Sequence, residues 1–528
     1  MPITRTCRIS GKEFIITDED LAFYEKISPT IGWEKFFIPP PTLCPEERLR
    51  RRLSWRGMYQ LYKSTCVITG KDIISFYPPN HPYKAIEQAL WWSDEIDNIS
   101  SGMDYDFSRS FSEQYSLLLQ TAYLPCLSNS YSTNENSEYV NGTNNIKDCY
   151  LVFNVASSED CEYSESVYFS HDIFDSYFIR ESESCFDSIG LIRCSHCLSL
   201  EESEDCRNVD FSYNMRGCSD CLLCHGQSNK KYLIKNIAYM EEEYFEEKKK
   251  YQNTLWVYDY RNLQVLFATM KKEENIEKVI NYGSENITGN HLSNCSNVHY
   301  ATDVVDSKNC RYVNTLWKSE DVYDCFSWWY TLENAYECVA VGSDASGVMG
   351  CYAVWTNTSR MYYCYSCYAC SDCIGCVWLK NKSFCILNKQ YSKEEYEDRA
   401  KKIIKNMIRD KEWWEYVSPE FSPWWYNETV AQDYFSLTKE EVLKMWYQWN
   451  DYLPPRPEAK KYIPASRLPE SIDDIPDDIL SWAIECEISG KYFKITRPEL
   501  DFYRKHHLPI PKKHYDVRRK ERFERRFR

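Results

Sequence analysis

A cysteine-rich stretch, CYSCYACSDCIGC, places a thiol at every third residue from 364 to 376. Thiols this close in sequence can bind a metal, form disulfides or line a core. A structural zinc site takes two C-x2-C pairs separated by a loop, and this stretch has no such loop. Thiols on stacked strands would lie about 4.8 Å apart with parallel side chains, a poor geometry for a disulfide. The spacing favours a wall of reduced cysteines, with a metal or disulfides as the alternatives.

These cysteines belong to a longer pattern with a period of twelve residues. Steps of twelve from Cys149 give an apolar series: Cys149, Cys161, Ile173, Cys185, Cys197, Val209 and Cys221. Small or apolar residues also fill every third place between them, a period that neither a helix nor an ordinary strand has. The pattern predicts a narrow right-handed β-solenoid of about 12 residues per rung, and the fold resembles that of the twelve-residue insect antifreeze solenoids.

A second series begins at Cys310 and Cys325, and it continues at Cys338, Cys351 and Cys364 with a spacing of thirteen. One-residue bulges would account for the longer step. The predicted inward cysteines of the two solenoids are Cys149, Cys161, Cys185, Cys197, Cys221, Cys310, Cys325, Cys364, Cys367, Cys370, Cys373 and Cys376.

The two solenoids end in related segments, because residues 229–244 and 381–396 are identical at eight of sixteen positions. A helix is expected after each segment, and Ser392 with Glu395 forms the capping box of the second one. Such helices protect the exposed end of a solenoid from edge-to-edge growth.

The two ends of the chain also resemble each other. CRISGKEFIITDEDLAFYEK (7–26) matches CEISGKYFKITRPELDFYRK (486–505) at twelve of twenty positions, and CVITGKDII repeats the start from Cys66. The pattern resembles a treble-clef or ribbon zinc finger in which half of the ligands are replaced, for example by Ser10 and Glu47. Zinc binding would need Cys7, Cys44 and Cys66 to combine. A metal-free relic is favoured, and no other cofactor is expected.

Arginine clusters lie near both ends. The residues with which they would bind a partner or nucleic acid are Arg48, Arg50, Arg51, Arg52, Trp55, Arg56, Arg518, Arg519, Lys520, Arg522, Arg525, Arg526 and Arg528. Arginines interleaved with aromatic side chains can follow a phosphate backbone and stack on bases. The alternatives are a basic amphipathic helix that packs on the acidic body of the protein, or a solvated tail.

The chain of 528 residues is acidic, with 79 Asp and Glu against 63 Lys and Arg. No secretory signal and no membrane span are visible, so its 25 cysteines suggest a reducing cytoplasm. No P-loop, dinucleotide fingerprint or nucleophile motif occurs, which argues against an enzyme. Asp148, Asp160 and Asp172 share one column and could order a cation, although turn-forming aspartates are common at such corners.

Four segments place the chain beside a known group: NSEYVNGTNNIKDCYLVF, KNKSFCILNKQYSKEEYE, YNETVAQDYFSLTKEEVL and ELDFYRKHHLPIPKK. They resemble an uncharacterised cysteine-rich family of small-genome candidate-phylum bacteria. The resemblance implies architecture and no activity. Members of that family keep the C-x-x-C and C-P-x-C motifs that this chain has lost.

The expected fold is mainly β with α caps, two solenoids, and small zinc-finger-like α+β modules at both termini. The expected segments are 1–80 finger-like modules, 81–136 helical connector, 137–232 first solenoid, 233–282 helical cap, 283–385 second solenoid, 386–450 Trp-rich helical cap, 451–480 Pro-rich linker and 481–528 C-terminal module with basic tail. The expected function is a non-enzymatic scaffold that docks a protein or ribonucleoprotein through its basic ends and solenoid faces. The alternatives are an acidic nucleic-acid mimic, a structural subunit of a larger assembly and, least favoured, a carboxylate-based hydrolase.

Overall fold

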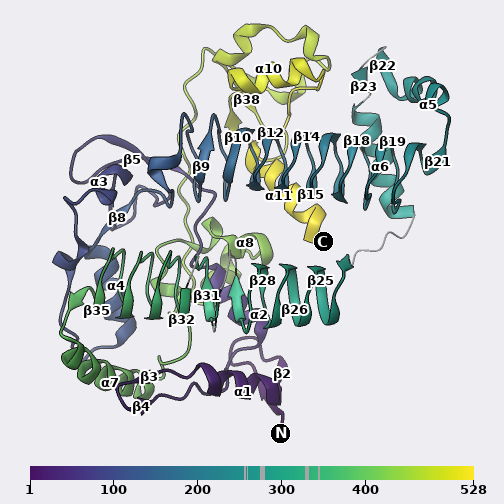
Figure 1. Ribbon diagram of the computed structural model, residues 1–528. Coiled ribbons are helices and arrows are strands. Elements are labelled where there is room, and N and C mark those ends of the chain that lie inside the picture. The colour runs from purple at the N-terminus through teal and green to yellow at the C-terminus, as the bar shows by residue number, and fades with distance from the viewer. Residues whose placement is uncertain are drawn as a thin grey trace. The chain divides into compact units, whose positions relative to one another are not determined.

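The computed structural model describes residues 1–254, 257–258, 260–273, 280–326, 332–333, 335–342 and 345–527. In these residues the chain is mainly β, with helices at the borders of two large sheets (Figure 1). Two compact units form, and each combines separate stretches of sequence. Unit 1 contains Met1–Leu127 and Glu277–Asp451, and unit 2 contains Ser128–Ile276 and Tyr452–Arg528.

The large sheet of unit 2, which we call ladder 1, is built from short parallel strands. They are β9 (Asn144–Lys147), β10 (Ala156–Glu162), β11 (Glu165–Tyr168), β12 (His171–Phe174), β13 (Tyr177–Arg180), β14 (Glu183–Phe186), β15 (Ile189–Ile192), β16 (Ser195–Leu198), β17 (Glu201–Glu204), β18 (Arg207–Asp210), β19 (Ser219–Leu222) and β20 (Lys231–Ile234). Strands two apart in sequence pair in parallel, so that Ile173 lies opposite Cys185, and Cys185 opposite Cys197. The twelve-residue period is thus the register of the sheet.

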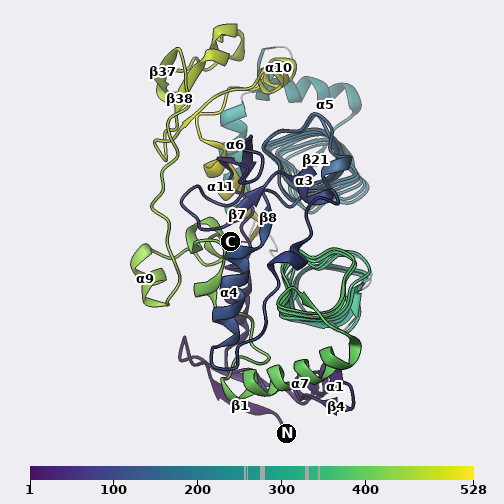
Figure 2. The same cartoon turned by 90° about the vertical axis from the view of Figure 1, so that its left-hand side faces the viewer.

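The period of three comes from the backbone. Along ladder 1 every third residue has a left-handed conformation, as at Asp160, Tyr163, Ser166 and Phe169, with φ between 51° and 57°. Each such residue turns the chain, and four turns return it to the same side after twelve residues (Figure 2). A left-handed conformation costs a non-glycine residue about 1–2 kcal/mol. The ladder hydrogen bonds and the buried core must offset that cost at each corner.

Inward side chains of ladder 1 are of two kinds. Those inside strands are apolar, whereas those at the bends are small, and serines there form a relay. The Ser170 hydroxyl donates to the carbonyl of Tyr168 at 2.8 Å and accepts the backbone N–H of Ser182 at 3.0 Å. The Ser182 hydroxyl in turn accepts the N–H of Cys194 at 3.0 Å. Where a serine stands one rung earlier, its hydroxyl therefore satisfies the bend N–H that faces the core.

The large sheet of unit 1, which we call ladder 2, follows the same plan. Its strands are β24 (Asn281–Tyr282), β25 (Glu285–Ser293), β26 (Ser296–Val305), β27 (Lys308–Arg311), β28 (Asn314–Trp317), β29 (Tyr323–Phe326), β30 (Leu332–Glu333), β31 (Tyr336–Val339), β32 (Ala345–Met349), β33 (Ser359–Tyr362), β34 (Ser371–Ile374) and β35 (Ser383–Ile386). Cys325 pairs with Cys338 across thirteen residues, whereas Cys373 pairs with Cys385 across twelve. The rung therefore tolerates one added residue without losing its pairing.

Three hairpins share one tight turn, and each carries the C-x-x-[ST]-G-K sequence. They join β1 (Ile3–Thr6) to β2 (Glu13–Ile16), β5 (Tyr62–Thr65) to β6 (Asp72–Ser75), and β38 (Trp482–Glu485) to β39 (Tyr492–Phe493). In each turn the glycine N–H donates to the cysteine carbonyl, at 2.9 to 3.1 Å. Gly11, Gly70 and Gly490 have φ of 66° to 71°, which explains the glycine at this position.

Two helices follow the first and the last of these hairpins. The N-terminal module consists of β1, β2, α1 (Asp18–Ile27) and α2 (Pro45–Leu53). The C-terminal module consists of β38, β39, α10 (Arg497–Lys505) and α11 (Tyr515–Phe527), with β37 (Lys461–Pro464) at the edge of its sheet. Thr17 and Thr496 open α1 and α10 with equivalent capping boxes. The sequence similarity of the two termini thus corresponds to one local structure.

The remaining elements cover or connect the ladders. In unit 1 they are β3 (Thr30–Ile31), β4 (Glu34–Lys35), β7 (Lys84–Ile86), α3 (Gln88–Trp92), α4 (Phe111–Thr121), β8 (Tyr123–Pro125), β36 (Lys389–Gln390), α7 (Lys393–Arg409), α8 (Val430–Tyr434) and α9 (Lys439–Lys444). In unit 2 they are β21 (Ile237–Ala238), α5 (Glu241–Lys248), β22 (Gln252–Thr254), β23 (Val257–Tyr258) and α6 (Tyr260–Glu273). The predicted capping box of α7, between Ser392 and Glu395, is confirmed. Among the described helices, none is long and apolar enough to cross a membrane.

Candidate functional site

The most specific polar site in unit 1 joins the N-terminal module to ladder 2. Asp324 is completely buried and has a left-handed backbone, with φ of 52°. It accepts hydrogen bonds from Arg48 Nε at 2.9 Å and from Arg52 Nη1 at 3.2 Å, both from α2. Beside it, the ring of Phe23 stacks on Tyr323 with centroids 3.8 Å apart. The module is therefore held by a buried ion pair with an aromatic contact next to it.

Unit 2 contains the same site, built from the C-terminal module and ladder 1. Asp175, buried and left-handed with φ of 47°, accepts from Arg518 and, at 2.7 Å, from Arg522 of α11. The ring of Phe502 stacks on Phe174 with centroids 3.8 Å apart. Figure 1 shows α11 lying across the strands of ladder 1.

The two sites also match on the preceding rung. The guanidinium of Arg48 lies over the ring of Tyr312 at 5.1 Å, and that of Arg518 lies over Tyr163 at 4.7 Å. Each tyrosine precedes the buried aspartate by twelve residues, which is one rung. We call these equivalent sites the docking sites. Removal of one partner from a buried ion pair of this kind leaves the other charge uncompensated and destabilises the protein by about 3–5 kcal/mol.

The predicted basic cluster near the N-terminus packs within unit 1, as the amphipathic-helix alternative described. The side chains of Arg48, Arg50, Arg51, Arg52, Trp55 and Arg56 are all buried. Besides the docking contacts, Arg50 pairs with Glu47 at 2.8 Å, and Trp55 Nε1 donates to Val417 at 3.2 Å. The physical reason is that α2 packs its basic face against acidic groups of unit 1.

The basic C-terminal tail also packs on its own unit, as the amphipathic-helix alternative proposed. Arg522 is buried, and Arg518, Arg519, Lys520, Arg525 and Arg526 are half-buried. Arg525 donates to Asp187 at 2.7 Å, and Arg519 lies 3.7 Å from Glu165. Arg528 lies outside the described residues. These arginines are therefore used for intramolecular contacts.

All twelve predicted inward cysteines are buried, and they belong to two core clusters, one in each ladder. Their thiols donate to backbone carbonyls two residues earlier, as Cys373 does to Ser371 at 3.3 Å. In ladder 2, Cys364 N–H donates to Cys351 Sγ at 3.2 Å, so a thiol can replace the serine of the relay.

The predicted metal ligands separate into two places. Cys44 lies beside Cys7, and Ser10 Oγ is 3.7 Å from Cys44 Sγ. Burial opposes ionisation of Cys7, but hydrogen bonds from Ser10 lower its pKa overall. Cys66 lies in the turn between β5 and β6. Glu47, the remaining finger position, is held by Arg50. Among the described residues, no group of three or more His, Cys, Asp or Glu could hold a metal ion.

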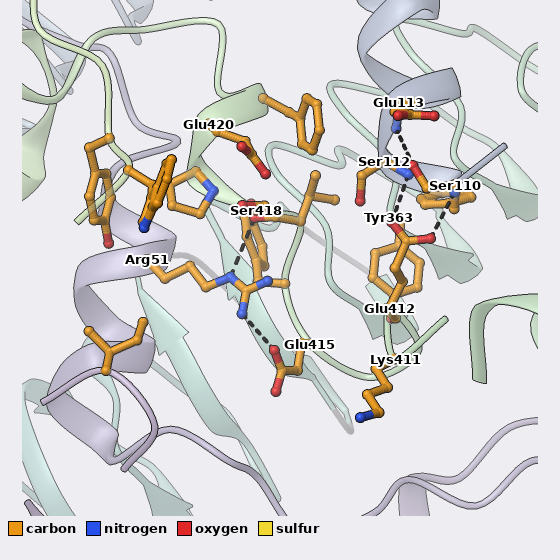
Figure 3. Close-up of a pocket in the computed structure, with 18 of the residues that line it drawn as sticks. Arg51, Ser110, Ser112, Glu113, Tyr363, Lys411, Glu412, Glu415, Ser418 and Glu420 are labelled. Carbon is orange, nitrogen blue, oxygen red and sulfur yellow. Dashed lines mark hydrogen bonds and ion pairs between the residues drawn. The ribbon is translucent and has the colours of Figure 1, made fainter. Parts of the chain in front are cut away.

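An open cavity of about 640 Å³ in unit 1 has charged walls, and two of its carboxylates, Glu412 and Glu415, are bound to neighbouring groups (Figure 3). Glu412 accepts the N–H groups of Phe111 and Ser112 at 2.8 and 3.0 Å, at the start of α4. Glu415 pairs with Arg51 at 2.9 Å. Burial raises the pKa of Glu415, but Arg51 and other neighbours lower it overall. These two carboxylates therefore hold the local structure together.

A second open cavity, of about 830 Å³, lies beside the predicted aspartate column of ladder 1. Asp148, Asp160 and Asp172 line it, and Asp172 accepts from Ser184 at 2.8 Å. Glu162 lies deeper, where burial and then Glu499 raise its pKa to about 8. Thr496 Oγ1 donates to Glu162 at 3.1 Å and belongs to the capping box that holds Glu499. Glu162 is thus part of the module contact.

The sequence interpretation missed the acidic halves of the docking sites. Arg48 and Arg518 occupy matching positions in the two modules, but Asp324 and Asp175 lie hundreds of residues away from them. The signal that would have found them is an aromatic–aspartate pair one rung after a tyrosine, in both ladders: Tyr323–Asp324 and Phe174–Asp175.

Comparison with known proteins gave no match, either to a family model or to a curated protein. The site is therefore interpreted from its own geometry.

Proposed function

We propose that this protein is a non-enzymatic scaffold whose two ladders are narrow β-solenoids of about 12 residues per rung and dock a protein or ribonucleoprotein. The single observation that carries the proposal is an outward row on ladder 1. Its members are Glu159, His171, Glu183, Ser195, Arg207, Ser219 and Lys231. All are exposed or half-exposed. We call them the outer row.

Parallel pairing puts neighbouring members of the outer row one strand spacing apart, so the row extends over about 29 Å. Its charge changes along that length, with Glu159 and Glu183 toward one end, beside Lys147 of the preceding strand, and Arg207 and Lys231 toward the other. A row with charges of both signs at fixed spacing can select a partner by electrostatic complementarity and fix its direction. No catalytic group is needed for that role.

The acidic-mimic alternative receives less support. Its acidic residues, named from the sequence, are Glu201, Glu202, Glu204 and Asp205. Glu201 is buried and accepts from Lys271 at 2.7 Å, and Asp205 pairs with Arg193 at 2.7 Å. Because their charges are largely compensated within unit 2, they do not present a continuous anionic surface.

The test removes charge from the outer row. The row variant carries Glu159→Ser, Arg207→Ser and Lys231→Ser. A control with the same change of net charge carries Asp398→Ser, Lys402→Ser and Lys405→Ser on exposed positions of α7. Each protein is purified from its native cell at low salt, and co-purifying protein and RNA are quantified.

We expect one defined partner with the wild type and the control, and a loss of about tenfold or more with the row variant. Equal recovery with the row variant, or no macromolecule with any of the three proteins, would refute the proposal. Circular dichroism of the row variant checks that ladder 1 remains folded.

A further inference from the structure

The two ladders end in the same way, but only one end is covered. Ladder 1 closes with the hairpin β20–β21 and then α5, and ladder 2 closes with β35–β36 and then α7 (Figure 1). An asparagine occupies the same place in each: Asn236 and Asn388. Asn236 accepts the N–H of His225 at 3.0 Å, and Asn388 accepts that of Val377 at 2.8 Å.

In ladder 2 a short segment of the same unit, residues 97–104, lies on this end; we call it the cover segment. Asn388 Nδ2 donates to the carbonyl of Asn98 at 3.2 Å and to Ser101 Oγ at 3.1 Å. The N–H of Met103 donates to the carbonyl of Leu387 at 3.1 Å. A Cβ on Gly102 would lie 2.6 Å from the carbonyl oxygen of Asn388, so only glycine fits there.

Charges fix the two ends of the cover segment. Asp97 pairs with Lys382 at 2.7 Å, and Asp104 pairs with Lys389 at 2.7 Å. Between them, residues Asn98–Ser101 form a 3₁₀ turn that brings the glycine over Asn388. The segment thus binds the polar groups of the last rung through one turn, one glycine and two carboxylates.

The corresponding end of ladder 1 keeps the asparagine and one of the two lysines and has, within the described part of unit 2, no cover segment. Lys230, which aligns with Lys382, is exposed and has no ion pair among the described residues. Where ladder 2 has Lys389, ladder 1 has Ile237, whose side chain is 60% exposed, and nearby Met240 is 73% exposed. This end combines one cation, one asparagine and an apolar edge.

We infer that the end of ladder 1 binds a peptide segment of a partner protein whose chemistry follows the cover segment. An acidic residue pairs with Lys230, a turn places a glycine over Asn236, and an apolar residue contacts Ile237 and Met240. The inference rests on the proposed scaffold function and adds to it a site and the chemistry of its ligand. It differs from the outer row, which lies on the side of ladder 1 and not at its end.

A synthetic peptide makes the inference testable with the full-length protein. The probe is fluorescein-labelled residues 95–106 with Asp104→Leu, EIDNISSGMLYD. Saturable binding in fluorescence polarisation is expected. Lys230→Glu should weaken it by about tenfold or more, and a peptide with Asp97→Lys should recover affinity for that variant. Lys147→Glu, on the first strand of ladder 1, is the control and should change nothing. A peptide with Gly102→Val should not bind.

Several outcomes would overturn the inference. They are the absence of saturation at about 1 mM peptide, equal affinity for wild type and Lys230→Glu, and no recovery in the charge exchange. A dimer in sedimentation velocity that Ile237→Asp abolishes would instead assign this end to a second copy of the chain. If the outer-row variant loses its partner while the peptide fails to bind, only this inference fails and the scaffold function stands.

Discussion

Both units attach a terminal module to a ladder through the same contacts, but the charges beside these contacts differ. In both, an arginine pair from a terminal module meets a buried left-handed aspartate, with a stacked aromatic contact beside it. One rung earlier the units differ. In unit 1, Arg311 donates to Thr17 at 3.0 Å and lies 3.5 Å from Asp20. In unit 2 the same place is taken by Glu162, which faces Thr496 near Glu499.

This exchange of an arginine for a glutamate changes what holds the module. Unit 1 places a cation beside its buried carboxylate, whereas unit 2 places two carboxyls together. Burial raises the pKa of Glu499 to about 7, and Arg518 only partly opposes it. The contact geometry is therefore shared, whereas the adjacent pair of buried carboxyls belongs to unit 2. In unit 1, burial raises the pKa of Glu337 to about 7, and Arg52 only partly opposes it.

The largest effect is expected from removal of the buried aspartates. Asp324→Ala leaves Arg48 and Arg52 buried without their carboxylate and should cost about 3–5 kcal/mol. Asp175→Ala should cost a similar amount, because the side chains of Arg518 and Arg522 are only 11% and 5% exposed. Hydrogen exchange should rise in the N-terminal module in the first variant and in the C-terminal module in the second.

Asp160→Ala, at an exposed corner of ladder 1, serves as the control and should leave exchange unchanged in both modules. If either docking variant loosened both modules equally, the two sites would not be independent contacts.

The next effect is expected from pH. The pKa values of Glu162 and Glu499, about 8 and about 7, lie above the value of about 4.3 in an unfolded chain. The folded state therefore holds these protons more tightly. The stability of the C-terminal module contact is highest below about pH 4, falls by several kcal/mol between about pH 5 and pH 8, and changes little above that range.

Limited proteolysis of the C-terminal module between pH 5 and pH 8.5 measures this loss. Glu162→Gln should keep the contact with Thr496 and remove most of the pH dependence of the C-terminal module. A constant rate of cleavage of the C-terminal module in the wild type would mean that the two carboxyls do not titrate in this range.

The parts that could be predicted from the sequence are those with local or periodic causes. The spacing from Cys149 to Cys161 fixes the register of ladder 1, and Ser392 with Glu395 fixes the start of α7. No local or periodic signal in the sequence indicates which ladder each module contacts. Arg48 meets Asp324 across 276 residues, and the N-terminal module packs on the ladder that comes later in the chain. A charge cluster alone does not tell whether its partner is internal, so the sequence left both partner binding and internal packing open for these arginines.

The smallest effects are expected in the cores, where the ladders use different atoms for the same relay. Ser170→Ala leaves the N–H of Ser182 without its acceptor and should cost about 1–2 kcal/mol. Ser170→Cys should cost less, about 0.5–1 kcal/mol, because in ladder 2 Cys351 already performs both roles. Its thiol donates to Met349 at 3.3 Å and accepts from Cys364 at 3.2 Å.

The reciprocal change, Cys351→Ser, completes the comparison. Its hydroxyl can make the same two hydrogen bonds, so it should destabilise ladder 2 less than Cys351→Ala, which removes both. Urea unfolding of the four variants, compared with the wild type, gives the differences in free energy of unfolding. If alanine is tolerated better than serine at position 351, the thiols of ladder 2 act as apolar filling, and the relay is a property of ladder 1 only.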